Sequence, residues 1–326
     1  MTETTQPVGV RVAVGVDTTR PSMARLCNWM LGGKDNYARE QDLGHQLDAV
    51  APSQRAAAWA SRQFQQRSLR YLVEHAGVHQ FLDIGAGLPV PPPWGVNTHE
   101  AVTHLQPLPG ADLPTVVYVD HDPVCLAHGR VLLETTDRSH YVRGDLLDPN
   151  LAQGEAATYL ELDQPIGVLL CGVLHHVDDE LGPAAVVRGW IDAVPDGSYF
   201  ILTHQWDPGG GTPLATAAAD CQDRYLDLMG SGWYRSRAEI TALFDGLHIL
   251  DPGLVVPGEW WPTGPVRKFP TIAESLVLVG VGRKPKRLKN SSSVPDGADR
   301  RQADSCSRNA NKIPGATTLE PGLGPR

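Results

Sequence analysis

The stretch that decides the fold is Phe81-Leu82-Asp83-Ile84-Gly85-Ala86-Gly87, an apolar run that ends in two closely spaced glycines. The apolar residues predict a buried strand. Glycines directly after a strand let the backbone turn sharply and pass close to a bound ligand. The segment therefore predicts an α/β fold whose ligand site lies at the carboxyl end of the sheet. Taken alone, it is equally compatible with an ordinary strand-to-helix turn in which Asp83 caps a local group.

On both sides of this stretch the pattern is that of a parallel sheet. Short aliphatic runs alternate with helical stretches, as in a sheet built from βαβ units. Seven strands are predicted, at residues 80–84, 115–119, 140–143, 166–171, 199–203, 247–250 and 275–281. Helices are predicted over residues 123–134, 183–193, 214–228 and 236–244. The first helix has Asp122 before Pro123 as a start signal, and the last has a capping-box pattern of Ser236 with Glu239.

The composition divides the chain into three zones. Residues 1–17 predict a loosely ordered lead-in, 18–284 a folded domain, and 285–326 a disordered tail rich in Ser, Asn, Pro and Gly. Within the domain, helical patterns at 22–31, 40–50 and 53–76 predict an N-terminal extension over residues 18–78, before a Rossmann-like core at 79–284. This extension is large enough to form a lid or a wall.

Charge and composition exclude several classes of protein. From Arg283 onward the chain has ten Lys or Arg and four Asp or Glu, so this tail carries a net charge of +6. Because the whole chain carries −9, the rest of it carries −15. Such a body disfavours nucleic-acid binding, because affinity for phosphates comes from Lys and Arg. No run approaches the roughly 18 apolar residues of a membrane helix, and no signal-peptide pattern opens the chain. We therefore expect a cytoplasmic protein with no membrane partner; its oligomeric state is not indicated.

Acids stand at the ends of two further predicted strands. Asp120, followed by His121, closes the second strand, where an acid accepts hydrogen bonds from both hydroxyls of a ribose. Asp145 and Leu146 follow the third strand, at a position that lies beside the adenine in this fold class. Asp120 can also be explained as a helix cap. Three strand-end acids in order, however, are much harder to explain by accident than one.

The spacing of the glycines points to a particular cofactor. Gly85 and Gly87 are not followed by a third glycine before the next helix, as the dinucleotide fingerprint requires. S-adenosylmethionine has no pyrophosphate, so its site can dispense with that glycine while Asp83 stays near the cofactor's cationic end. S-adenosylmethionine is therefore the predicted cofactor. A nicotinamide-dependent oxidoreductase is the less favoured alternative, and a non-catalytic protein that binds S-adenosylmethionine as a signal is another.

The chain resembles the actinobacterial S-adenosylmethionine-dependent methyltransferases formerly classed as a domain of unknown function. Leu31-Gly32-Gly33-Lys34-Asp35-Asn36 is the most specific part of this resemblance, because the general physics of the fold does not call for it. The other matching stretches are 20–25, 81–89, 97–100, 117–124, 144–146 and 251–255. The resemblance implies a class I methyltransferase fold and a cofactor pocket partly closed by the N-terminal segment. Relative to the family, residues 91–95 are an insertion that either lines the pocket or extends into solvent.

The resemblance also implies a role for residues near the N-terminus. Gly33, Lys34, Asn36 and Tyr37 are expected to close over the carboxylate and amino group of the cofactor. The alternative is a helix C-cap at the two glycines followed by a solvated turn. Arg25, one helical face away, is a further candidate for binding a carboxylate.

Candidates for catalysis follow the fourth strand. Methyl transfer is an in-line displacement that depends on orientation and desolvation, and it needs a general base only if the nucleophile has a proton to lose. His175 and His176 are candidate bases, because imidazole titrates near neutrality; each can equally be a buried structural histidine. No further ligand at suitable spacing joins them, so no metal is predicted. The expected partner is a small-molecule methyl acceptor that offers oxygen or nitrogen.

Overall fold

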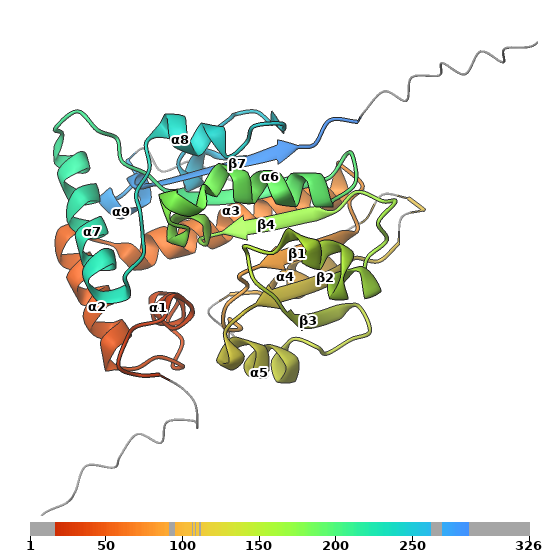
Figure 1. The fold of residues 1–326 in the computed structure, drawn as a ribbon, viewed down its shortest axis with the longest axis horizontal. Coiled ribbons are helices and arrows are strands. Elements are labelled where there is room, and N and C mark those ends of the chain that lie inside the picture. The colour runs from red at the N-terminus through yellow and green to blue at the C-terminus, as the bar shows by residue number, and fades with distance from the viewer. Residues whose placement is uncertain are drawn as a thin grey trace, which may run out of the picture. The chain divides into compact units, whose positions relative to one another are not determined.

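A seven-stranded sheet in the order β3-β2-β1-β4-β5-β7-β6 forms the centre of the molecule (Figure 1). The computed structural model describes residues 17–90, 95–105, 107, 109–110, 112–261 and 269–286. The strands are β1 (Gln80–Ile84), β2 (Thr115–Asp120), β3 (Ser139–Arg143), β4 (Gly167–Cys171), β5 (Tyr199–Gln205), β6 (His248–Ile249) and β7 (Val277–Arg283). β7 runs antiparallel to both of its neighbours, β5 and β6, and the other strand pairs are parallel. The strand order reverses between β1 and β4, and ligands bind at the carboxyl ends beside such a reversal.

The predicted sheet is confirmed, with seven mostly parallel strands and helices on both faces. The strand starts differ from the predicted ones by at most two residues. The largest difference is at β7, which starts at Val277 because α9 (Ile272–Ser275) precedes it. Thr271 and Glu274 form a capping box that starts this short helix. The helix start signals at Asp122 and Ser236 are also confirmed, since each side chain accepts a hydrogen bond from a backbone N–H of the first turn.

The two faces of the sheet carry separate cores, because side chains alternate along a strand. On one face Phe81, Val116 and Tyr118 pack with α3 (Gln54–Glu74), α4 (Thr98–Thr103) and α5 (Pro123–Leu132). On the other, Leu82 and Val117 pack with α6 (Pro183–Ala193) and α8 (Arg237–Ala242). These strand side chains are almost completely buried. Each contributes about 1.5–3 kcal/mol of hydrophobic stabilisation.

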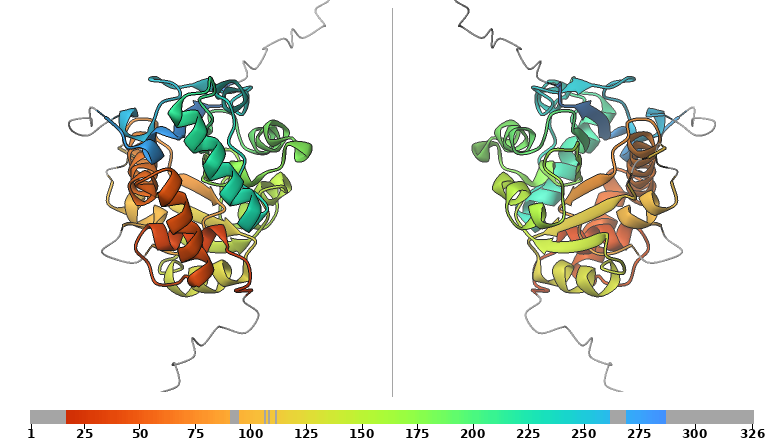
Figure 2. Two further views of the ribbon diagram at one scale, coloured as in Figure 1. Left: turned by 90° about the vertical axis from the view of Figure 1, so that its left-hand side faces the viewer. Right: turned by 90° about the vertical axis from the view of Figure 1, so that its right-hand side faces the viewer.

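A third core joins the N-terminal extension to a helix from the far end of the sequence. The extension consists of α1 (Met23–Met30), α2 (Ala38–Val50) and α3, as predicted from its helical patterns. Leu26 and Leu43 pack with Tyr225 of α7 (Pro213–Met229). Figure 2 shows α2 and α7 side by side. The extension is therefore fixed against the body of the domain.

Parts of the predicted organisation lie outside the described residues. These are residues 1–16 of the lead-in, 91–94 of the insertion and 287–326 of the tail.

Candidate active site

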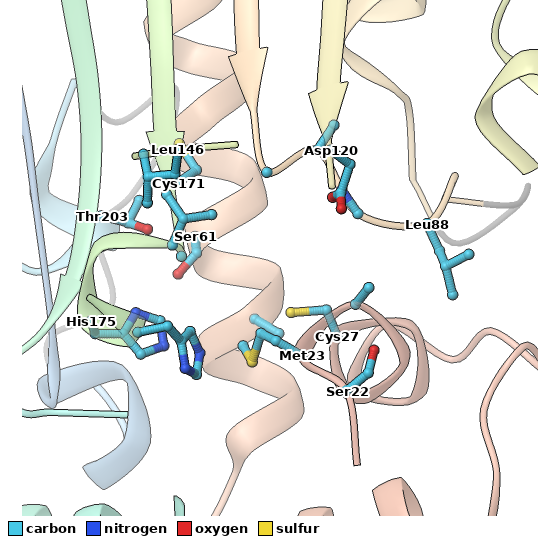
Figure 3. A pocket seen from close by; sticks show the side chains of 18 of the residues that line it. Ser22, Met23, Cys27, Ser61, Leu88, Asp120, Leu146, Cys171, His175 and Thr203 are labelled. Atoms are coloured by element: carbon cyan, nitrogen blue, oxygen red, sulfur yellow. The ribbon is translucent and has the colours of Figure 1, made fainter. Parts of the chain in front are cut away.

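A cavity of about 510 Å³ lies at the carboxyl ends of the parallel strands. Its volume falls within the roughly 300–1,000 Å³ that is typical of small-molecule sites. The loops after β1, β2, β3 and β4, the end of β5 and the helices α1, α3 and α7 supply its lining. Figure 3 shows Asp120 and Leu88 on one side of it and His175 and Thr203 on the other. We call these two sides the acid end and the histidine end.

The glycine loop after β1 has the conformation that only glycine adopts readily. Gly85 and Gly87 have φ of 67° and 70°, in the left-handed region that disfavours other residues. A Cβ on Gly85 would also lie 2.4 Å from a side-chain carbon of Val173. The loop is joined to β2, because the N–H groups of Gly85 and Ala86 both donate to the carbonyl of Val119. Both predicted glycines line the cavity.

Asp120 organises the acid end. Its Oδ2 accepts a hydrogen bond of 2.8 Å from the Gly87 N–H, and its Oδ1 accepts one of 2.9 Å from the Asp122 N–H. Burial raises the pKa of Asp120, although these two hydrogen bonds oppose the shift. Each carboxylate oxygen has a second lone pair, so the side chain that orders the loop still has acceptors to offer to the cavity.

Asp83 lies beside it, at the end of β1. Its Oδ2 accepts a short hydrogen bond of 2.6 Å from the Thr98 hydroxyl, and its Oδ1 makes no hydrogen bond within the described part of the chain. Burial raises the pKa of Asp83, whereas the Thr98 hydrogen bond and the charge of Arg62 lower it. Asp83 therefore presents one unused oxygen at the cavity.

The third predicted acid also reaches the cavity. Asp145 Oδ1 accepts from the Leu147 N–H at 2.9 Å, which shapes the turn after β3. The carbonyl of the next residue, Leu146, accepts from Trp190 Nε1 at 2.7 Å. His121 lines the rim, where its side chain is 78% exposed. The structure thus brings all the predicted strand-end residues to one cavity.

The short helix α4, which the sequence analysis did not predict, supports this end from behind. The side chain of Asn97 bonds to both the N–H and the carbonyl of Val90. Thr98 donates to Asp83, and His99 bonds to the Tyr118 hydroxyl. With only six residues, α4 is too short to give a periodic signal in the sequence.

The residues of the N-terminal motif do not line the cavity: these are Gly33, Lys34, Asn36 and Tyr37. They fold around Asn28 of α1, whose Oδ1 accepts from the Asp35 N–H and from Asn36 Nδ2. A Cβ on Gly33 would lie 2.3 Å from Asn28 Nδ2, so the glycine is needed for this packing. Asn28 itself does line the cavity. The motif lies one layer behind the site, and its contact with the cofactor stays a prediction.

Arg25 also lies outside this cavity. It forms a buried ion pair of 2.8 Å with Glu40 and donates to the carbonyls of Asp17 and Arg20. Glu40 in turn accepts from the Tyr37 N–H. These contacts tie the residues before α1 to the start of α2, so a structural role accounts for Arg25.

Two neighbouring imidazoles form the histidine end. His175 is 1% exposed, and neither of its ring nitrogens has a partner within the described residues. His176 Nδ1 lies 2.8 Å from Ser231 Oγ, while its Nε2 is buried and lacks a described partner. Burial lowers the pKa of His176 to about 4 and that of His175 well below its usual range. Both rings are therefore neutral at pH 7.

Arg235, which the sequence analysis missed, holds the histidines in place. They lie in the 3₁₀ turn η3 (Leu174–His176). Arg235 donates to the carbonyls of Leu174 and Val177 on either side of them, to His204 Nε2, and twice to Asp179. All five N–H groups of the guanidinium are thus used. No local pattern in the sequence marks this residue, because its partners come from distant segments.

Arg62 is the second residue that was missed. Within the described lining it is the only Lys or Arg, and it projects from α3. The cavity-facing residues of this helix are Gln54, Ala57, Ala58, Ser61, Arg62 and Gln65, a stripe of helical spacing. Small residues beside a charged one within such a stripe are the sequence signal that could have identified Arg62, because they leave room for a ligand next to a charge.

Two further observations concern metal ligands and membrane-spanning helices. No group of three or more potential metal ligands occurs in the part of the chain that the structure describes. None of the described helices is long and apolar enough to cross a membrane.

Comparisons with known proteins show the family. A family model described as S-adenosyl methyltransferase matches residues 11–285. A crystal structure of a candidate methyltransferase from Thermobifida fusca YX is 31% identical, covers 83% of this chain and 98% of its own, and has a TM-score of 0.74. A DUF574 family protein from Streptomyces avermitilis MA-4680 is 29% identical, with coverage of 82% and 99% and a TM-score of 0.73. No curated protein matches the chain.

The cavity fits the cofactor of this family. S-adenosylmethionine presents ribose hydroxyls, an adenine amine, an ammonium group and a carboxylate, and the acid end offers carboxylates together with one guanidinium. The nicotinamide-dependent alternative is excluded by the family. The chain belongs to the S-adenosyl methyltransferase family and is an S-adenosylmethionine-dependent class I methyltransferase.

Proposed function

We propose that the protein transfers a methyl group to an oxygen or nitrogen of a small, uncharged molecule held at the histidine end. One observation carries this proposal: within the described lining, the histidine end has no Asp, Glu, Lys or Arg, and His175, His204 and Tyr225 there are almost completely buried. Its residues are Cys171, Gly172, Val173, His175, His176, Val177, Leu181, Thr203, His204, Gln205, Tyr225, Met229, Ser231 and Val277. A charged acceptor would lose its hydration there without a counter-charge from the protein lining, at a cost of several kcal/mol.

The nearest buried cation does not change this conclusion. Arg235 lies behind His204, and its five N–H groups are already bonded. Its charge is paired with Asp179 at 2.7 Å. An anionic acceptor in the cavity would therefore find no free donor on Arg235.

The acid end is assigned to the cofactor. We expect Asp120 to accept from the ribose hydroxyls, Asp145 to accept from the adenine amine beside Leu146, and His121 to cover the rim. When bound, the cofactor supplies a methyl group on a sulfonium, which needs no metal to be transferred. The protein's part is to align this group with the acceptor and to exclude water.

His176 is the better candidate for a general base. Ser231 holds its ring, and in the tautomer in which Nδ1–H donates to Ser231, Nε2 carries the free lone pair. In that tautomer His176 Nε2 would accept the proton that the acceptor's oxygen or nitrogen loses when it is methylated. His175 and the edge of the Tyr225 ring form the wall beside it.

A labelling experiment tests the acceptor class. The purified protein is incubated with isotopically methyl-labelled S-adenosylmethionine and a cell extract, and the label is followed by mass spectrometry. We expect the label in low-molecular-mass neutral compounds and none of it with the His176→Gln variant. Label confined to protein or nucleic acid would contradict the proposal.

A further inference from the structure

A continuous chain of hydrogen bonds connects the only cationic side chain of the described lining to Asp83. Arg62 Nη1 donates to Gln65 Oε1 at 2.9 Å, and Gln65 Nε2 donates to the Thr98 hydroxyl at 3.1 Å. The Thr98 hydroxyl donates to Asp83 Oδ2 at 2.6 Å. In each of these three hydrogen bonds the donor lies on the Arg62 side and the acceptor on the Asp83 side. The chain therefore runs in one direction, from the guanidinium on α3 to the carboxylate on β1.

Both ends of the chain keep free hydrogen-bonding capacity at the cavity. Arg62 uses one of its five N–H groups within the described residues, and Asp83 uses one of its two oxygens. The residues between them are buried: Gln65 is 5% exposed and Thr98 2%. The hydrogen bonds therefore fix the position of a positively charged donor, Arg62, relative to a negatively charged acceptor, Asp83.

We infer that Arg62 and Asp83 bind the carboxylate and the ammonium of the cofactor's amino-acid part, and that Gln65 and Thr98 are the positioning residues that set these two groups at matching places. This assignment replaces Lys34 and Arg25 as the source of positive charge, because neither lines the cavity. It rests on the cofactor that the family uses and needs no assumption about the methyl acceptor.

The charge pattern of the cavity supports the assignment. The described lining has four carboxylates, on Asp83, Asp120, Asp122 and Asp145, against the single guanidinium of Arg62. At the acid end, these carboxylates repel an anionic group of the ligand, and among the described lining side chains only Arg62 attracts it. The charge of Arg62 reaches the β1 end, because it lowers the pKa of Asp83 against the effect of burial.

Calorimetry with three ligands separates the roles of these residues. S-adenosylhomocysteine has both charged groups, its decarboxylated analogue keeps only the amine, and 5′-methylthioadenosine has neither. Arg62→Gln should weaken S-adenosylhomocysteine about tenfold or more, as expected for a lost charged hydrogen bond, and leave the other two ligands within about twofold. Asp83→Asn should weaken both amine-bearing ligands and spare 5′-methylthioadenosine.

The positioning residues have their own test. Thr98→Val removes the hydroxyl at nearly constant shape and should weaken S-adenosylhomocysteine several-fold without changing 5′-methylthioadenosine, and Thr98→Ser should restore most of the affinity. The matched control for Arg62→Gln is Arg70→Gln, since Arg70 is an exposed arginine of the same helix, α3.

Two results would overturn the inference. One is unchanged affinity of Arg62→Gln for S-adenosylhomocysteine. The other is an equal loss for all three ligands, which would mean that the substitutions disturb the whole cavity. Neither readout involves an acceptor, so failure of the small-molecule proposal would leave this test intact.

Discussion

The acid end and the histidine end of the cavity differ in how their polar groups are bonded. Both oxygens of Asp120 already accept backbone N–H groups, and Asp83 accepts from Thr98. At the other end, both nitrogens of His175 and one of His176 have no partner within the described residues. Buried polar groups without partners each cost about 1–3 kcal/mol. The acid end is thus preorganised for its ligand, whereas the histidine end has buried ring nitrogens that no described group satisfies.

The largest expected effect is at the histidine end. His176→Gln should lower methyl transfer by about 10²–10⁴-fold, the usual contribution of a general base. The affinity for S-adenosylhomocysteine, measured by calorimetry, should stay unchanged, because His176 does not belong to the acid end. His248→Gln, an exposed histidine of β6, is the control. A variant that keeps more than about a tenth of the activity would assign His176 a structural role.

The second prediction uses the pH dependence of stability. The pKa of His176 falls from its usual value to about 4 in the folded protein. Between about pH 4 and 6.5 the unfolded chain therefore binds more protons, so stability is full above 6.5 and is lost as the pH falls towards 4. The loss due to this histidine is about 3 kcal/mol.

Urea unfolding at a series of pH values measures this effect as the difference between the wild type and His176→Gln. Burial raises the pKa values of Asp83 and Asp120, which acts with the opposite sign, but both proteins share those groups. Parallel curves for the two proteins across this range would show that His176 is not held neutral by burial.

The third prediction concerns the acid end. Asp120→Ala should weaken S-adenosylhomocysteine tenfold or more, about 1.5–3 kcal/mol for a charged hydrogen bond. Unlike Arg62→Gln, it should weaken 5′-methylthioadenosine equally, because the ribose is common to both ligands. His121→Ala should change either affinity less than about twofold, since its side chain is largely exposed. Unchanged affinity of the Asp120 variant would refute the ribose assignment.

The sequence predicts the acid end better than the histidine end for a physical reason. Asp83, Asp120 and Asp145 follow successive parallel strands, and the carboxyl ends of such strands meet at one edge of the sheet. The sheet alone therefore brings them together. Arg62 reaches the site only because α3 runs along the cavity, and Arg235 only because the fold brings it to two distant segments, residues 174–179 and His204 of β5.

The N-terminal motif shows why adjacency in sequence is a weaker guide. Two glycines followed by Lys34 and Asn36 predict a loop that closes on a ligand. In the structure the Asp35 N–H and Asn36 Nδ2 donate to Asn28 Oδ1, seven residues before Asp35. A local turn around a buried amide and a ligand-binding loop require similar residues, so the sequence does not separate them.

All five N–H groups of Arg235 are hydrogen-bonded, and this has a consequence for protein engineering. Because one guanidinium holds η3 at both flanks through backbone carbonyls, replacing Arg235 would remove several bonds at once, and lysine, with three donors in place of five, cannot substitute for the arginine. Thr203, Tyr225 and Met229 line the same end from β5 and α7 and make none of these bonds. Libraries that aim to widen or redirect the acceptor range should vary these three positions and leave Arg235 unchanged.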